Sequence, residues 1–209
     1  KKDVSASAVC TLMQKAILAA QVECRYLSEY QAEAGEIARR GLKLIVLPGA
    51  WGLSARERAA LKAFVEAGGT LAADAEAGSR NEHGTLQPQS LLQEWLGDLP
   101  AITADGRSEA VPLGRGRVAA CDFEAWTAAS KTADGKEDGA DHAAGLLRLA
   151  GLTPEVAVTT AAGEPLPLAF GLFRDGAAAY FGFVGLGKGG MVADEPTVAV
   201  DVSIRAPAH

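Results

Sequence analysis

Apolar and polar positions over residues 41–78 predict a strand, a helix and a second strand in direct succession. Residues 44–47 form a short continuous apolar run, which is typical of a parallel strand covered by helices on both faces. Ser54, with Glu57 three residues later, is a capping-box signature for the start of a helix. The pattern therefore predicts one strand–helix–strand unit of a parallel sheet.

The helix of this unit has one apolar face. Leu61, Phe64 and Val65 recur at helical spacing, and Gly68-Gly69 marks the helix end, where one glycine is expected in the left-handed conformation. Residues 70–73 then resume as a strand, and the connection is expected to be right-handed.

Weaker periodicities predict the remaining elements of the first 151 residues. Residues 8–20 have helical spacing, and residues 22–27 alternate as a strand does. The later segments are a helix at 91–96 closed by Gly97, a hairpin of strands 110–113 and 117–121 joined by 114–116, a polar insertion at 130–141, and a helix at 142–150.

The pattern changes beyond Gly151 to short strands separated by turn residues. Strands are predicted at 156–159, 168–173, 177–184 and 197–204, and Asp175-Gly176 is a two-residue hairpin signal. We therefore expect an α/β domain with an open parallel sheet at 1–151 and a small antiparallel β domain at 152–209. A strand that would normally precede the helix at 8–20 is missing from the pattern.

Charge and hydropathy exclude two classes of partner. The formal net charge is −6, and no Lys/Arg cluster alternates with aromatic residues as a nucleic-acid surface requires. The longest apolar stretches are shorter than a membrane span. We expect neither nucleic acid nor a membrane as a partner, and the sequence leaves the compartment open.

Cysteine and histidine spacing gives no support to metal chemistry. Cys10, Cys24 and Cys121 show no CxxC spacing and are expected to be free thiols. The only histidines are His83, His142 and His209, and no two of them are at metal-ligand spacing. We expect no metal and no cofactor.

The loop after the second strand holds the candidate catalytic residues Asp74, Glu76 and His83. It follows a parallel strand, at the edge where open sheets bind ligands, and a carboxylate could orient the His83 imidazole. The alternative is that Asn81 and His83 brace the loop through backbone hydrogen bonds. A catalytic role for Ser79 is disfavoured because no G-x-S-x-G motif presents it.

Trp51 and the carboxylate pair of Asp122 and Glu124 are two further candidate sites. Trp51 lies on the loop after the first strand and is a ligand-binding candidate together with Asn81 and His83. Its ring could stack on a sugar or on a neighbouring chain, or it could pack under its own loop. Asp122 and Glu124 would share one strand face by alternation, as paired glycosidase carboxylates can, although a solvated edge is favoured.

Several segments in combination resemble part of a known protein family. They are LKLIVLPGAWGLSARERAALKAFVEAGGTLAADAEAG, the following NEHG, PEVAVTTAAGEPLP and LFRDGAAAYFGFV. Together they look like the C-terminal part of family-42-like glycoside hydrolases: their β-galactosidase trimerisation domain and part of the following β domain.

The resemblance implies a fold and a role. The fold would be an open parallel sheet of the flavodoxin-like, class I glutamine amidotransferase-like type, truncated at both ends. The role would be non-catalytic, with an upstream TIM barrel as catalytic partner and a homo-oligomer as assembly. Ala75 or a neighbour stands where amidotransferases carry their nucleophilic cysteine, which argues against glutaminase activity.

Three functions remain open on the sequence. The first is a non-catalytic accessory and oligomerisation domain that shapes a carbohydrate site. The second is an independent hydrolase or amidotransferase-like enzyme that uses the Asp74, Glu76 and His83 loop. The third is a carbohydrate-binding module without chemistry.

Overall fold

The computed structural model describes residues 6–104, 106–129, 140–154, 156–160, 163, 168–175, 178–185 and 200–204. Its helices are α1 (Ala6–Ala19), α2 (Glu29–Glu33), α3 (Glu36–Arg39), α4 (Ala55–Glu66), α5 (Leu91–Leu96), α6 (Phe123–Ala129) and α7 (Ala140–Leu149). Its strands are β1 (Leu44–Leu47), β2 (Thr70–Asp74), β3 (Val111–Leu113), β4 (Gly116–Cys121), β5 (Val156–Thr160), β6 (Leu168–Asp175), β7 (Ala178–Gly185) and β8 (Val200–Ile204).

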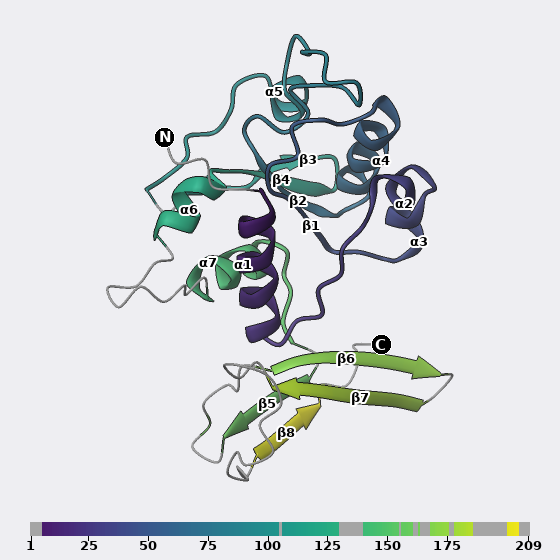
Figure 1. Ribbon diagram of the computed structural model, residues 1–209, viewed down its shortest axis with the longest axis vertical. Helices are drawn as coiled ribbons and strands as arrows, with labels where there is room; N and C mark the ends of the chain where they lie inside the picture. The colour runs from purple at the N-terminus through teal and green to yellow at the C-terminus, as the bar shows by residue number, and fades with distance from the viewer. Residues whose placement is uncertain are drawn as a thin grey trace.

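A four-stranded open sheet forms the centre of the α/β part (Figure 1). The strand order is β1-β2-β4-β3, with β1, β2 and β4 parallel and β3 antiparallel at one edge. Leu44 pairs with Thr70, and Thr70 pairs with Arg117. The predicted α/β class and the parallel β1–α4–β2 unit are therefore confirmed.

Helix α4 forms for the reasons visible in its sequence. The Ser54 hydroxyl accepts the N–H of Glu57 at 3.1 Å, and the Glu57 carboxylate accepts the N–H of Ser54 at 2.8 Å, so two helix-start donors are satisfied. The helix ends before Gly68, whose φ is +117°. The predicted capping box and glycine end are confirmed.

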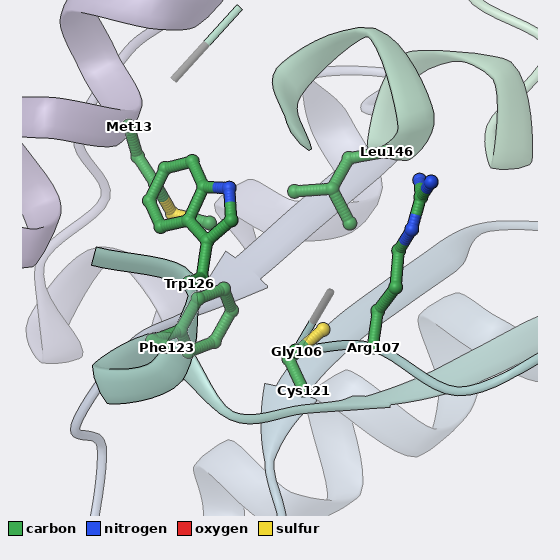
Figure 2. Close-up of a pocket in the computed structure, with 7 residues that line it drawn as sticks. All are labelled: Met13, Gly106, Arg107, Cys121, Phe123, Trp126 and Leu146. Carbon is green, nitrogen blue, oxygen red and sulfur yellow. The ribbon is translucent and has the colours of Figure 1, made fainter. Parts of the chain in front are cut away.

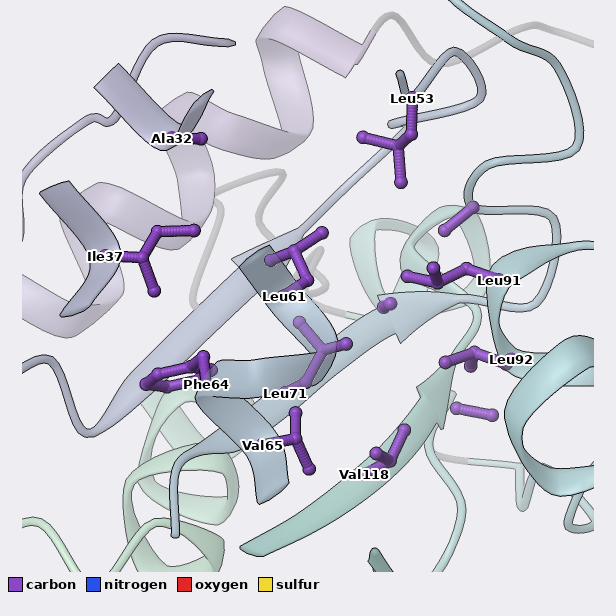
Figure 3. Packing of buried hydrophobic residues seen from close by; sticks show 13 residues of the cluster. Ala32, Ile37, Leu53, Leu61, Phe64, Val65, Leu71, Leu91, Leu92 and Val118 are labelled. Atoms are coloured by element: carbon purple, nitrogen blue, oxygen red, sulfur yellow. The ribbon is translucent and has the colours of Figure 1, made fainter. Parts of the chain in front are cut away.

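The main core lies between the sheet and the layer of α4 and α5 (Figure 3). Val65, Leu71 and Val118 are fully buried there. Each such side chain contributes about 1.5–3 kcal/mol through the apolar area removed from water. Because strand side chains alternate, Ala72 and Cys121 face the opposite layer, which contains α1, α6 and α7.

The predicted hairpin is present at the sheet edge, but its turn is shorter than the expected 114–116, because Gly116 begins β4. Leu113 pairs with Gly116, so Gly114 and Arg115 form a two-residue turn, and Gly114 has φ +61°. This positive φ at the first turn position is the reason that a glycine suits it.

The prediction of a strand at residues 22–27 was wrong. This segment has no strand assignment, and it follows Gln21, whose φ is +60°. Val22 and Cys24 are half-buried against the layer of α1 and α7, whereas Glu23 and Arg25 are exposed. The alternation therefore reflects burial of one face of an extended segment, without strand pairing among the described residues.

The chain turns into helix α6 directly after β4, which contradicts the strand alternation assumed for Asp122 and Glu124. The Asp122 carboxylate accepts the N–H of Ala125 at 2.8 Å and thus caps α6, while Glu124 lies in its first turn. Both side chains are exposed. They do not form a carboxylate pair on one strand face.

The C-terminal strands pair antiparallel, as predicted, in two ladders, β5–β8 and β6–β7. Asp175, expected in the hairpin turn, pairs with Ala178 as the last residue of β6. Residues 176–177, the insertion at 130–139, His209 and the side chain of His142 lie outside the described residues. Figure 1 shows these ladders beyond the C-terminal end of α1.

Gln21 joins this β part to the α/β part. Its buried side-chain amide donates to the carbonyl of Val158 at 2.6 Å and accepts the Val158 N–H at 2.7 Å. The amide thereby pairs with β5 as a neighbouring strand would, and it satisfies polar groups at a buried contact.

Candidate functional site

The candidate site is the carboxyl edge of the sheet, where β1, β2 and β4 end side by side. Asp74 at the end of β2 is in register with Cys121 at the end of β4, and the loop after β1 begins at Pro48 beside them. Open α/β sheets bind ligands at this edge because their loops converge there.

Asp74 joins the three strand ends. Its carboxylate accepts a short hydrogen bond from the N–H of Gly49, after β1, and one from the N–H of Phe123, after β4, at 3.3 Å. Burial raises the pKa of the Asp74 carboxyl; the two N–H donors lower it in part, and Asp122 and Glu76 raise it further. The side chain therefore holds the loops in place.

Glu76 lies in the turn that follows β2. It is exposed, its carbonyl accepts the N–H of Ser79 at 3.0 Å, and its charge acts on Asp74. The structure thus brings Asp74 and Glu76 near each other. Ala75, at the position where the resemblance would put a nucleophile, is half-buried and has no reactive group.

Asn81 and His83 occupy the tip of the long loop at 75–90. The Asn81 Oδ1 accepts the N–H of His83 at 3.0 Å and of Thr85 at 2.9 Å, so Asn81 braces the turn. The His83 side chain is 80% exposed, and its Nε2 lies 3.8 Å from Glu82. No hydrogen bond or ion pair of the described residues joins this imidazole to Asp74, Glu76 or Ser79.

Trp51 stands on a rim built from two loops. The Trp51 carbonyl accepts the N–H of Arg80 at 2.8 Å, and isolated bridges link Gly52 to Arg80 and Arg80 to Leu86. Trp51 is 56% exposed and Leu86 is 67% exposed. This rim, defined by Trp51 and Leu86, presents apolar surface on an ordered backbone. The sequence does not indicate Leu86, because a single leucine in a polar loop forms no periodic pattern.

The three cysteines are not joined in disulfides, and Cys121 is buried beneath the edge. It borders a cavity of about 10 Å³ with Met13, Phe123 and Trp126, and the two aromatic rings meet edge-on at 6.1 Å (Figure 2). Burial raises the pKa values of the Cys10 and Cys24 thiols, which lowers their thiolate fraction.

Within the described ranges, no group of three or more His, Cys, Asp or Glu side chains is arranged to hold a metal ion. In the same part of the chain, no helix has the length and apolar character needed to cross a membrane.

The chain is similar in fold to solved GH42 β-galactosidases. Gan42B from G. stearothermophilus matches 86% of this chain and 30% of its own, at 14% identity and a TM-score of 0.61. The β-galactosidase from Bacillus circulans sp. alkalophilus matches 87% of this chain and 32% of its own, at 10% identity and a TM-score of 0.59. This chain thus spans about a third of their length. No protein-family model matches the sequence, and no curated protein does.

Proposed function

We propose that this chain is a non-catalytic accessory and oligomerisation domain of a glycoside hydrolase-like protein. The proposal includes a class I glutamine amidotransferase-like architecture, two domains at 1–151 and 152–209, and an upstream catalytic barrel as partner. The fold similarity to about a third of GH42 β-galactosidase chains supports it.

The observation that carries the proposal is the engagement of Asp74. A catalytic carboxylate must reach substrate, whereas this one accepts N–H groups from the loop after β1 and from the first residue of α6, which follows β4. His83, the other half of the candidate acid–base pair, has an exposed side chain whose carboxylate neighbour is Glu82, not Asp74. The edge is therefore suited to holding loops in a fixed shape.

The Trp51–Leu86 rim is the proposed contact surface for a second copy of the chain. Tryptophan contributes large apolar area at interfaces, and the bridges through Arg80 hold both residues on one backbone platform. A fixed platform loses little conformational entropy on association.

Light scattering coupled to size exclusion tests the assembly role. The wild-type chain should associate with rising concentration, and Trp51→Ala and Leu86→Ala should weaken that association. Tyr30→Ala is the matched control, because Tyr30 is an exposed aromatic residue, 77% accessible, on a different element, α2. A wild-type chain that stays monomeric throughout, or equal weakening by Tyr30→Ala, would contradict the proposal.

A carbohydrate-binding role is the second candidate, and the exposure of the Trp51 ring favours it. Aromatic rings stack on sugar faces, so galactose or an oligosaccharide should change the fluorescence of the wild-type chain and leave Trp51→Ala unchanged. Incubation with glutamine, simple esters and aryl glycosides tests the enzymatic alternative. We expect no turnover, and turnover abolished by His83→Ala would restore that alternative.

A further inference from the structure

A groove between strand β4, the segment that precedes β3 and helix α7 concentrates positive charge in an otherwise acidic chain. Its volume is about 380 Å³, within the range of small-ligand sites. Arg107, Arg117 and Arg148 line it together with one acidic residue, Glu109, a formal excess of two positive charges. The whole chain has a net charge of −6.

The floor of the groove is held by backbone pairing. Arg107 bridges to Cys121, and the N–H of Ser108 donates to the carbonyl of Ala120 at 2.8 Å. The buried Ser108 hydroxyl accepts the N–H of Ala120 at 3.0 Å. The segment that carries Arg107 is therefore fixed to β4 and not a free loop.

The three arginines come from three separate segments of the chain and line the same groove. Arg117 lies on β4 four residues before Cys121, so alternation puts it on the sheet face toward α7. Gly145 and Arg148 are three residues apart on α7 and share a helix face. Figure 2 shows Arg107 extending toward α7, and a Cβ added to Gly145 would lie 1.3 Å from its Nη1. The glycine thus leaves the space that the guanidinium fills.

We propose that this groove binds a small ligand through an oxyanion group, a phosphate or a carboxylate. Guanidinium groups present planar N–H donors that match both oxyanions in bidentate geometry. Among the ion pairs of the described residues, none uses Arg117 or Arg148, and both side chains are exposed in the groove. A concave site on an acidic chain favours a small anion over an extended polyanion. This inference is independent of the proposed function.

Titrations followed by amide NMR shifts test the site on the 209-residue chain at low ionic strength. The probes are inorganic phosphate, glucose 6-phosphate and glucuronate, with glucose as the neutral control. At least one anion should shift the amides of Ser108, Arg117 and Gly145 saturably, and added salt should weaken binding. Response to the phosphates alone identifies a phosphoryl ligand, and response to glucuronate identifies a carboxylate ligand.

Two variants test the geometry. Arg117→Gln should weaken binding about tenfold through loss of a charge-assisted contact. Gly145→Ala should weaken it with the net charge unchanged, because the new methyl group displaces the Arg107 guanidinium. Arg115→Gln, in the exposed turn of the β3–β4 hairpin and outside the groove, is the charge-matched control. Equal weakening by Arg115→Gln, no response to any anion, or glucose binding as tight as that of the anions would overturn the proposal.

Discussion

Replacing Asp74 tests whether this carboxylate holds the three strand ends together. Asp74→Ala removes the acceptor for the N–H groups of Gly49 and Phe123. Asp74→Asn keeps one carbonyl oxygen, so it can accept from one of these donors while its amide nitrogen faces the other.

The expected magnitudes follow from the two bonds. A partly buried N–H left without an acceptor costs about 1–3 kcal/mol, and the 3.3 Å bond from Phe123 belongs at the lower end of that range. Relief of the buried charge offsets part of the loss. We therefore expect Asp74→Ala to lower the free energy of unfolding by about 2–4 kcal/mol and Asp74→Asn by about 1–2 kcal/mol.

The pH dependence has a definite sign. Because the pKa of Asp74 is raised in the folded chain, the folded state binds more protons than the unfolded state between the two pKa values. The stabilisation from Asp74 is fully present below its unfolded pKa, about 3.9, and is lost as pH rises through the folded value. The stability difference between wild type and Asp74→Asn should therefore shrink with rising pH and then level off.

Urea unfolding of the wild type and both variants, at several values between about pH 4 and pH 8, measures these differences. The Asn variant serves as the control without a titrating group at this position. If Asp74→Ala unfolds within about 0.5 kcal/mol of wild type, the bracing role is refuted. A wild-type advantage over Asp74→Asn that grows with pH would contradict the raised pKa of Asp74.

Gly116→Ala and Gln21→Ala test the packing of the fold, and Gly52→Ala is the control for the first of them. Gly116→Ala would place a methyl group 2.2 Å from two backbone carbonyl oxygens. We therefore expect urea unfolding to show a free energy of unfolding lower by about 3 kcal/mol or more. Gly52→Ala, where the nearest neighbour lies at 3.5 Å, should lower it by less than about 1 kcal/mol. Gln21→Ala removes both hydrogen bonds to Val158. It should lower the free energy of unfolding by about 2 kcal/mol and accelerate hydrogen exchange of the Val158 amide. Unchanged exchange would show that the buried Gln21 amide does not hold β5.

The strand–helix–strand unit was predictable because its signals are local. The length of the apolar run at β1, the capping box at Ser54 and the glycines after α4 each act within a few residues. The hairpin turn at Gly114-Arg115 is local in the same sense. Alternation of apolar and polar residues was less informative on its own. Residues 22–27 are buried on one face without strand pairing among the described residues. The strand pattern extended to Asp122 and Glu124 was wrong because β4 ends before them and α6 begins.

Short helices were missed although one had a signal. Ser28 and Gln31 form a capping box at the start of α2, but a helix of five residues gives no readable apolar period. Its stability comes from tertiary packing, where Ala32 joins the core against α4.

The sequence by itself placed Trp51, Asp74 and the loop of Asn81 and His83 at one edge, because parallel strands end together. Only the tertiary structure decided that the Asp74 carboxylate is occupied by backbone donors and that the His83 side chain faces solvent. Likewise, no spacing in the sequence relates Arg107, Arg117 and Arg148, which the tertiary fold brings to one groove. Local propensity sets where elements begin and end, whereas contacts between distant segments follow from which apolar faces pack together.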